Sequence, residues 1–233
     1  MKQQLIIFCT LITLILTGCS SSESETKEQK LELPASTVKK LTVDNRNGNI
    51  DISTNSTSDK IEASIYAKAK GISIDKLKLD LSEKNGVANL NTSFDGQFFS
   101  NSETWVDVKL SVPKNVKIEF KENHRDGDIT VSKLDSDINI LNVNGNIDIS
   151  NVKGTVSVTN RDGKINISNV SSDINVDNNN GAVVIKNING SVRAKIGDGS
   201  ADINSIEKNV TILGAKNDKI KVDDVKGKVT FNK

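Results

Sequence analysis

Arginine is the residue type whose placement in this sequence most directly predicts chemistry. Three of the four arginines, Arg46, Arg125 and Arg161, each stand immediately before an Asp-Gly or Asn-Gly pair. The planar guanidinium can donate two parallel hydrogen bonds to phosphate oxygens, so we expect these arginines to contact the phosphates of an anionic polymer. The alternative is that each forms a turn-stabilising salt bridge with a neighbouring Asp. The sequence leaves both interpretations open.

Other residue types that support catalysis are scarce. His124 is the single histidine, so no Ser-His-Asp triad and no histidine-based metal site can be assembled. Its place in the turn before Gly127 predicts a side chain exposed to water. Carboxylates such as Asp148, Asp173 and Asp202 alternate outward with lysines, as on a solvated face, and the repeats offer few aromatic residues for stacking a sugar. We therefore expect no enzymatic activity, no metal and no cofactor.

The N-terminus predicts export and lipidation. Lys2 precedes an apolar run from Leu5 to Leu16, which has the length of a signal peptide and is too short to span a bilayer. The following Leu16-Thr17-Gly18-Cys19 resembles the bacterial lipobox, which implies cleavage before Cys19 and acyl chains on that cysteine. The alternative is an uncleaved signal anchor with an incidental cysteine. We expect residues 1–18 to be the signal peptide of a lipoprotein held on the extracytoplasmic face of the cell membrane.

The mature chain is expected to begin with a flexible tether. Cys9 leaves with the signal peptide, so the lipidated Cys19 is the remaining cysteine and no disulfide can form. Residues 20–30 contain only Ser, Glu, Thr, Lys and Gln, a composition that cannot bury enough surface to offset the entropy of ordering. We therefore predict a lipidated cysteine and flexible tether over residues 19–34.

Composition sets wider limits on the function. The chain has 233 residues, of which 35% are hydrophobic and 3% aromatic, which predicts one domain with an aliphatic core. Removing Lys2 with the signal peptide leaves 30 of the 31 basic residues against 30 acidic ones. This balance argues against nucleic acid or an acidic membrane surface as the main partner.

An eighteen-residue repeat fills the second half of the sequence. Glycines recur at intervals of eighteen, each directly after Asp or Asn, at Gly127, Gly145, Gly163, Gly181 and Gly199. The Asx-Gly pair tolerates positive φ, so it predicts one tight turn per repeat. Aliphatic residues stand two, four, seven, eleven and thirteen places after each glycine, in the first repeat Ile129, Val131, Leu134, Ile138 and Ile140.

This spacing predicts an all-β, single-domain β-solenoid, also called a β-helix. Points two and four alternate, as do points eleven and thirteen, so each 18-residue coil holds two short strands with one face inward. The spacing disagrees with a left-handed hexapeptide helix, and the turns lack the glycine and aspartate pattern of the calcium-binding nonapeptide roll. Asn151, Asn169 and Asn187 fall on one outward line and are expected to form an amide ladder. We assign residues 126–233 to the regular coils.

Residues 35–125 repeat the same pattern with interruptions. Asn47-Gly48 opens one further coil, and alternating apolar residues predict longer strands over 61–70, 77–81 and 104–112. We expect these strands to form an antiparallel cap or flap that is continuous with the coils as one domain. Most aromatic residues lie here, among them Phe94, Phe98, Phe99 and Trp105. They either fill the core of the cap or form an exposed ligand patch.

The segment from Trp105 to Pro113, the run that follows to Phe120 and the repeated Asx-Gly units together resemble the bacterial putative-adhesin domain family of unknown function. The similarity covers roughly Leu41 to Phe231. It implies a β-helical fold on exported or membrane-attached proteins, some of them in cell-envelope stress modules. It provides no catalytic residue to transfer to this chain.

Together these features predict a non-catalytic cell-surface lipoprotein with an adhesin-like β-solenoid, which binds or scaffolds at the cell envelope. Its expected partners are the membrane, through the lipid anchor, and an envelope polymer or envelope protein. The alternatives are an accessory or sensory component of a cell-envelope stress response system and a polysaccharide-active enzyme. Lys219, Lys221 and Lys228 lie on the last strands, where lysines discourage edge-to-edge pairing, so a monomer is expected.

Overall fold

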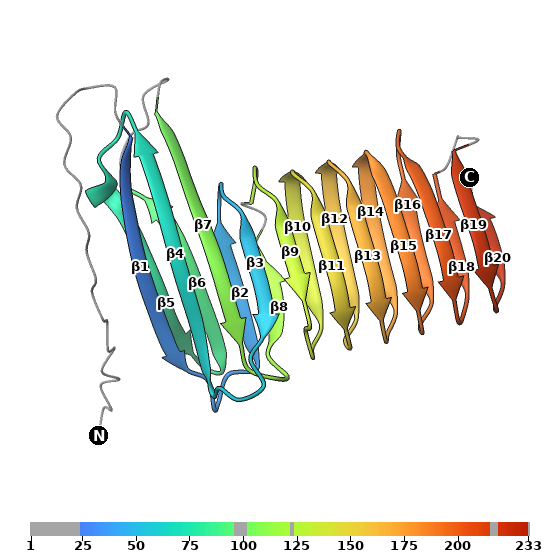
Figure 1. Ribbon diagram of the computed structural model, residues 1–233, viewed down its shortest axis with the longest axis horizontal. Helices are drawn as coiled ribbons and strands as arrows, with labels where there is room; N and C mark the ends of the chain where they lie inside the picture. Colours follow the sequence, from blue (N-terminus) through green and yellow to red (C-terminus); the bar gives the residue numbers. More distant parts are fainter. Residues whose placement is uncertain (1–23, 96–101, 122–123, 215–218, 233) are drawn as a thin grey trace.

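The computed structural model describes residues 24–95, 102–121, 124–214 and 219–232 of the chain. Two ten-stranded sheets face each other along a rod, with the longer N-terminal strands at one end and the C-terminus at the other (Figure 1). Successive strands of the coils alternate between the two sheets, so the predicted β-solenoid is confirmed.

Each regular coil contributes one strand to each sheet. The first sheet receives β9 (Ile129–Ser132), β11 (Ile147–Val152), β13 (Ile165–Val170), β15 (Ala182–Ile188), β17 (Ser200–Ile206) and β19 (Ile220–Val225). The second receives β10 (Ile138–Asn144), β12 (Val156–Asp162), β14 (Ile174–Asn180), β16 (Val192–Ile196), β18 (Val210–Leu213) and β20 (Val229–Asn232). Neighbouring strands are parallel, and residues eighteen apart pair, as Ile147 does with Ile165. The last coil is one residue longer, so Ala201 pairs with Ile220.

The first part of the chain begins this rod and closes its end. The strands β2 (Lys40–Asn45), β3 (Ile50–Thr54) and β8 (Lys117–Phe120) pair in parallel as further coils. The first sheet is then extended by β7 (Glu103–Val112), β4 (Lys60–Lys70) and β1 (Glu25–Pro34). The second is extended by β6 (Val87–Phe94) and β5 (Leu77–Lys84), and a 3₁₀ turn, η1 (Ile74–Lys76), leads into β5. The pairs β1–β4, β4–β7 and β5–β6 are antiparallel, which confirms the predicted cap.

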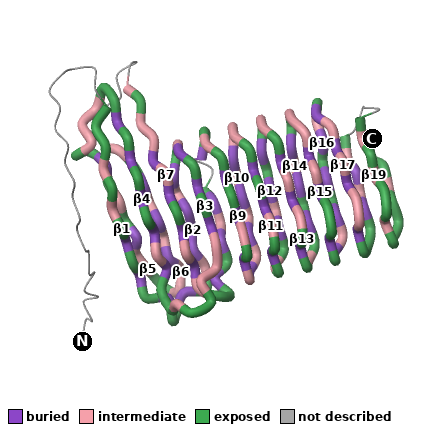
Figure 2. Tube along the Cα trace, viewed as in Figure 1, coloured by how far each residue is buried: buried purple, intermediate pink, exposed green. Residues whose placement is uncertain are grey.

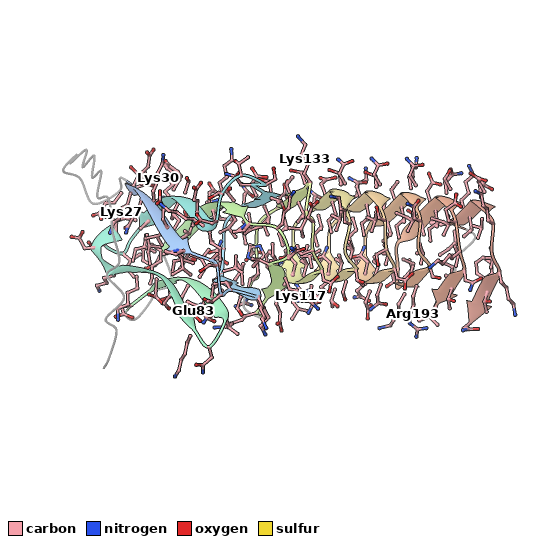
Figure 3. The ribbon with its side chains drawn as sticks, turned by 90° about the horizontal axis from the view of Figure 1, so that it is seen from below. Lys27, Lys30, Glu83, Lys117, Lys133 and Arg193 are labelled. Carbon is pink, nitrogen blue, oxygen red and sulfur yellow. The ribbon has the colours of Figure 1, made fainter. Side chains whose placement is uncertain are left out.

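The core is an aliphatic layer between the two sheets. Figure 2 shows buried positions alternating along the strands. One coil illustrates the pattern, with 2% exposure or less at Ile147, Ile149, Val152, Val156 and Val158. Burying each such side chain stabilises the fold by about 1.5–3 kcal/mol. In Figure 3 the inward side chains fill the space between the sheets, while Lys117 and Lys133 project away from the rod.

The prediction of a flexible tether over residues 19–34 is wrong for residues 25–34. Residues 25–34 form β1, which pairs with β4 along ten residues. Leu31 and Leu33 are buried against the core. An edge strand forms backbone hydrogen bonds with one neighbour only. Ten paired residues and two buried leucines are enough to order β1, although its composition alone predicts disorder.

Residues 1–23, which carry the predicted signal peptide and Cys19, lie outside the described residues, as do Phe98 and Phe99. In the described part of the chain, no helix has the length and apolar character needed to cross a bilayer.

Asparagine fixes one corner of each coil. Asn151, Asn169 and Asn187 have φ values of 57°, 55° and 58°, a left-handed conformation that asparagine adopts more readily than most residues. The Nδ2 group of Asn169 donates to Oδ1 of Asn151 at 3.3 Å, and that of Asn187 donates to Oδ1 of Asn169 at 3.1 Å. The predicted amide ladder is confirmed. The same three residues therefore turn the chain and link successive coils.

The Asx-Gly corner leaves no room for a side chain. Gly145 has a φ of +131° and Gly163 a φ of +134°, where a residue with a Cβ is strained. A Cβ on Gly145 would lie 2.0 Å from the carbonyl oxygen of Gly127, and one on Gly163 would lie 2.1 Å from that of Gly145. The glycines of successive coils are therefore stacked backbone on backbone.

We expect Gly145→Ala to destabilise the rod severely, by more than about 4 kcal/mol, because the methyl group would overlap a backbone carbonyl. The matched control is Gly214→Ala. Gly214 has a φ of +72°, and a Cβ there would meet its nearest atom, the carbonyl oxygen of Ile196, at 3.5 Å. That variant should lose only about 1–2 kcal/mol, the cost of the left-handed conformation. Urea unfolding measures both, and equal losses would contradict the stacking argument.

Candidate functional site

Two of the three predicted arginines lie side by side. Arg46 follows β2 and Arg125 precedes β9, in neighbouring coils where the cap meets the regular rod. The backbone N–H of Arg125 donates to the carbonyl oxygen of Arg46 at 2.7 Å. Each stands two residues before a stacked glycine, so the glycine stacking brings them together although they are far apart in the sequence. Both residues are exposed.

The two arginines line a surface cavity of about 740 Å³ that the cap completes. Lys68 and Lys70 reach it from β4, and Trp105 reaches it from β7. Because β4 and β7 are antiparallel with Lys68 directly opposite Trp105, these side chains share the outer face of the first sheet. We call the cavity lined by these five residues the junction cavity. A second cavity of about 630 Å³ shares Arg46 and Arg125 with it.

Basic groups predominate in the lining of the junction cavity. Beside its four basic residues stand two acidic ones, Glu103 and Asp126. Oδ1 of Asp126 already accepts a hydrogen bond from Asn144 at 2.8 Å. Among the described residues, neither Arg46 nor Arg125 has an ion pair. Both guanidinium groups can therefore donate hydrogen bonds to an external anion.

Arg161 lies apart from the junction cavity. It stands two coils beyond Arg125, about 10 Å along the rod. Its Nε donates to Oδ2 of Asp162 at 2.7 Å, and its Nη2 donates to Oδ1 of Asn144 at 3.1 Å. The salt-bridge interpretation therefore describes Arg161. For Arg46 and Arg125, contact with an anion stays a prediction.

The sheet beneath Trp105 holds its ring in place. The indole Nε1–H donates to Oδ1 of Asp107 at 2.8 Å, and the same oxygen accepts the backbone N–H of Asn49 at 2.7 Å. The ring is half-buried and borders the junction cavity. Phe94, in contrast, packs against the core and lines the second cavity. Phe94 thus contributes to core filling, whereas Trp105 offers a fixed aromatic surface at the cavity.

The prediction of an exposed His124 is wrong, because this residue is 1% exposed. It lies three residues before Gly127. The residues at the equivalent position of other coils are also buried, namely Asn45, Asn142, Asn160 and Asn178. Its Nδ1 donates to the carbonyl oxygen of Asn45 at 2.8 Å. Burial lowers the pKa of His124, and the carbonyl groups of Asn45 and Gly127 oppose this shift. The imidazole is therefore neutral at pH 7.

The buried slot before each glycine joins the cap to the coils from inside. In the coils, Nδ2 of Asn142 donates to Oδ1 of Asn160 at 3.1 Å, and Nδ2 of Asn160 donates to the carbonyl oxygen of Gly145 at 3.2 Å. In the cap, Oγ1 of Thr92 donates to Oδ1 of Asn45 at 2.7 Å. This inner column was not among the features predicted from the sequence. Its signal is the asparagine that recurs three places before the glycines.

One family model and several solved structures are similar to this chain. The model described as Toastrack DUF4097 matches residues 67–231. A putative cell adhesion protein from Clostridium sporogenes is 13% identical over 89% of this chain and 99% of its own, with a TM-score of 0.36. A putative adhesin from Parabacteroides merdae is 15% identical over 87% and 95%, with a TM-score of 0.38. No curated protein matches the chain.

The buried imidazole predicts a pH dependence of stability. In the unfolded chain His124 titrates near pH 6.5, whereas its folded pKa is lower. The unfolded state therefore binds the proton first, and stability falls as the pH drops below about 6.5 toward the folded pKa, by at most about 1.4 kcal/mol per pH unit. His124→Asn places the amide of the other coils in this slot and should remove the loss.

Urea unfolding of the unaltered and His124→Asn chains at pH 7.5 and 5.5 measures the effect. Both chains carry the same carboxylates and the chain has no second histidine, so the comparison isolates the contribution of His124. An unfolding free energy that falls equally in both chains over this range would contradict the assignment to His124.

Proposed function

The chain belongs to the Toastrack DUF4097 family, and from this premise we propose that it is a non-catalytic, lipid-anchored envelope protein that binds an anionic polymer. The polymer binds at the junction cavity, and the rod holds that cavity at a fixed place on a rigid scaffold. The proposed polymer carries phosphate groups between sugar or polyol units.

The observation that carries this proposal is that the guanidinium groups of Arg46 and Arg125 lie exposed in successive coils and form no ion pair with any described residue. The spacing of strands in a sheet sets them about 5 Å apart along the rod at the backbone. Each guanidinium can donate two parallel hydrogen bonds to one phosphate. Lys68 and Lys70 add compact positive charge from β4. The cavity thus has donors enough for one or two phosphate groups.

Trp105 adds an aromatic stacking surface to the charged groups of the proposed site. An aromatic face packs against the C–H face of a sugar ring, and here the indole is fixed by its hydrogen bond to Asp107. A ring that is already oriented loses little conformational freedom on binding. The combination of a fixed ring with basic side chains supports a polymer of phosphates and rings or polyols as the ligand.

The partners of the coil carboxylates support binding rather than cleavage. Asp148 accepts a hydrogen bond from Asn166 at 2.6 Å, and Oδ1 of Asp173 accepts the backbone N–H of Ser191 at 2.7 Å. Both acids therefore bond to the next coil instead of converging with a second acid on one point. Glycoside hydrolysis needs two carboxylates that flank the same bond.

The lipobox supports an anchor at Cys19. With acyl chains on that residue, β1 begins six residues later, at Glu25, so the cap end of the rod is the end near the membrane. The junction cavity then lies within a few strands of the membrane-proximal end, where polymers attached to the envelope are within reach.

Substitution of the two arginines tests the polymer site. Arg46→Gln with Arg125→Gln should weaken binding of poly(glycerol phosphate) at least tenfold, because the bidentate donors are removed. Trp105 is the single tryptophan of the chain and borders the cavity, so its fluorescence during titration reports occupancy. Binding by the unaltered chain should weaken with added salt.

The matched control is Arg161→Gln with Arg193→Gln, which removes the same charge elsewhere. Arg161 is paired with Asp162, and Arg193 projects from the regular coils (Figure 3). This control should bind the polymer as the unaltered chain does. Equal weakening by both double variants would mean general charge attraction and would count against the junction cavity.

Acylation at Cys19 can be tested directly. The unaltered chain should incorporate a labelled fatty acid in a bacterial host, and Cys19→Ser should incorporate none, since it removes the acceptor sulfur. Cys9→Ser, within the predicted signal peptide, should label normally. Mass spectrometry of the purified chain locates the label and the mature N-terminus. Label retained in Cys19→Ser would exclude the anchor.

A further inference from the structure

The two ends of the rod differ in how their apolar side chains are covered. At the cap end, β1 and β5 contact each other, and Leu31 and Leu81 are 8% and 5% exposed. At the other end, the described chain has no strand beyond the last coil, and Val229 and Phe231 are 37% and 58% exposed. Figure 2 shows the change toward exposed positions at β19. The described part of the chain therefore caps one end only.

The last coil also leaves two strand edges unpaired. β19 pairs with β17 and β20 pairs with β18, and neither has a second neighbour among the described strands. The N–H and C=O groups on such an edge are a template for a further strand. Beside them, Ile220, Val222 and Val225 continue the inner columns but are only partly buried. The end combines two open edges with an apolar centre.

We propose that this last coil binds the last coil of a second copy of the chain, end to end. A two-fold axis perpendicular to the rod places β19 antiparallel to β19 of the second copy and β20 antiparallel to β20 of the second copy. Both sheets then continue from one copy into the next, and the apolar columns meet across the contact. Such an isologous contact closes on itself, so assembly stops at two chains.

Charge selects the register of this contact. Residues opposite each other across antiparallel strands point to the same side of the sheet. Pairing centred on Val222 sets Lys221 of one copy opposite Asp223 of the other, twice by symmetry. Pairing centred on Lys221 would set two lysines opposite each other. Lys221 and Asp223 form an ion pair at 2.9 Å within one chain, so both side chains already lie on one side of β19.

The sequence alone predicts a monomer, because lysines on a terminal strand repel a second edge. A lysine repels a second edge only where the residue opposite it carries no negative charge. In the structure, Asp223 lies on the same side of the strand as Lys221. In the two-fold contact, Asp223 of one copy lies opposite Lys221 of the other. The oligomeric state decides between the two predictions.

End-to-end pairing has a consequence that rests on the lipid anchor proposed above. β1 lies at the opposite end of the rod from β19 (Figure 1). The N-terminal strands of the two copies therefore lie at the far ends of the pair. A pair of this kind joins two facing surfaces rather than two neighbours on one surface.

Sedimentation equilibrium tests the pairing. The chain from residue 19 onward with Cys19→Ser contains every described strand, and at high concentration it should have twice the mass of one chain. Lys221→Asp and Asp223→Lys each set like charges opposite each other, so each variant alone should remain single. An equimolar mixture of the two should pair, because every contact between unlike variants joins an acid with a base.

The control is Lys195→Asp, which breaks an ion pair with Asp177 in a middle coil and should leave pairing unchanged. Circular dichroism checks that each variant keeps its strands. An unaltered chain that stays single at every concentration overturns the proposal. The proposal is also overturned if the mixture of Lys221→Asp with Asp223→Lys has the mass of one chain. Both variants lack the ion pair within the chain, so only a contact between unlike copies can bring acid and base together in the mixture. Polymer binding at the junction cavity, read by Trp105 fluorescence, is independent of either result.

Discussion

The contact on which the coils from β3 to β17 depend is that of one glycine with the backbone carbonyl group of the residue stacked before it. A Cβ on Gly199 would lie 1.9 Å from the carbonyl oxygen of Gly181, and one on Gly48 would lie 2.0 Å from that of Val106. The column thus begins on β7 of the cap and continues through the coils. A side chain at any of these points would force neighbouring coils apart. Because the glycines hold one position in each of these coils, all residues at a given offset from them fall into rows.

The rows explain how so polar a surface is stable. In the row just before the glycines, acids alternate with amides: Asn144 donates to Asp126 at 2.8 Å, and Asn180 donates to Asp162 at 2.6 Å. An acid in every coil would set like charges about 5 Å apart along the whole rod. The alternation replaces this repulsion with hydrogen bonds, and the bond from Asn180 is the main reason why the pKa of Asp162 is lowered. The outer side chains of the coils are therefore occupied largely with one another.

The sequence predicts what repeats and misses what depends on long-range pairing. The glycine period, the inward columns and the Asn151 ladder follow from offsets within one repeat. β1 was missed because an edge strand is stabilised by its partner β4, which its own composition does not report. His124 was misjudged because its turn is polar, although the slot it shares with Asn142 is internal. Lys68 and Trp105 join the arginines through an antiparallel register, and no spacing in the sequence specifies that register.

The candidate site lies where the repetition of the coils is broken. Arg161 has an acid next to it, and the acid is positioned by the row to receive its guanidinium. Arg46 is followed by an asparagine, which offers no charge. Among the described residues, Arg125 has no ion pair with the acid that follows it. On the other side of these arginines stands the cap, whose β4 presents lysines instead of a further acid. At this junction the row of acids and amides ends, and no described acid forms an ion pair with Arg46 or Arg125. An external anion can therefore take the place that Asp162 holds beside Arg161.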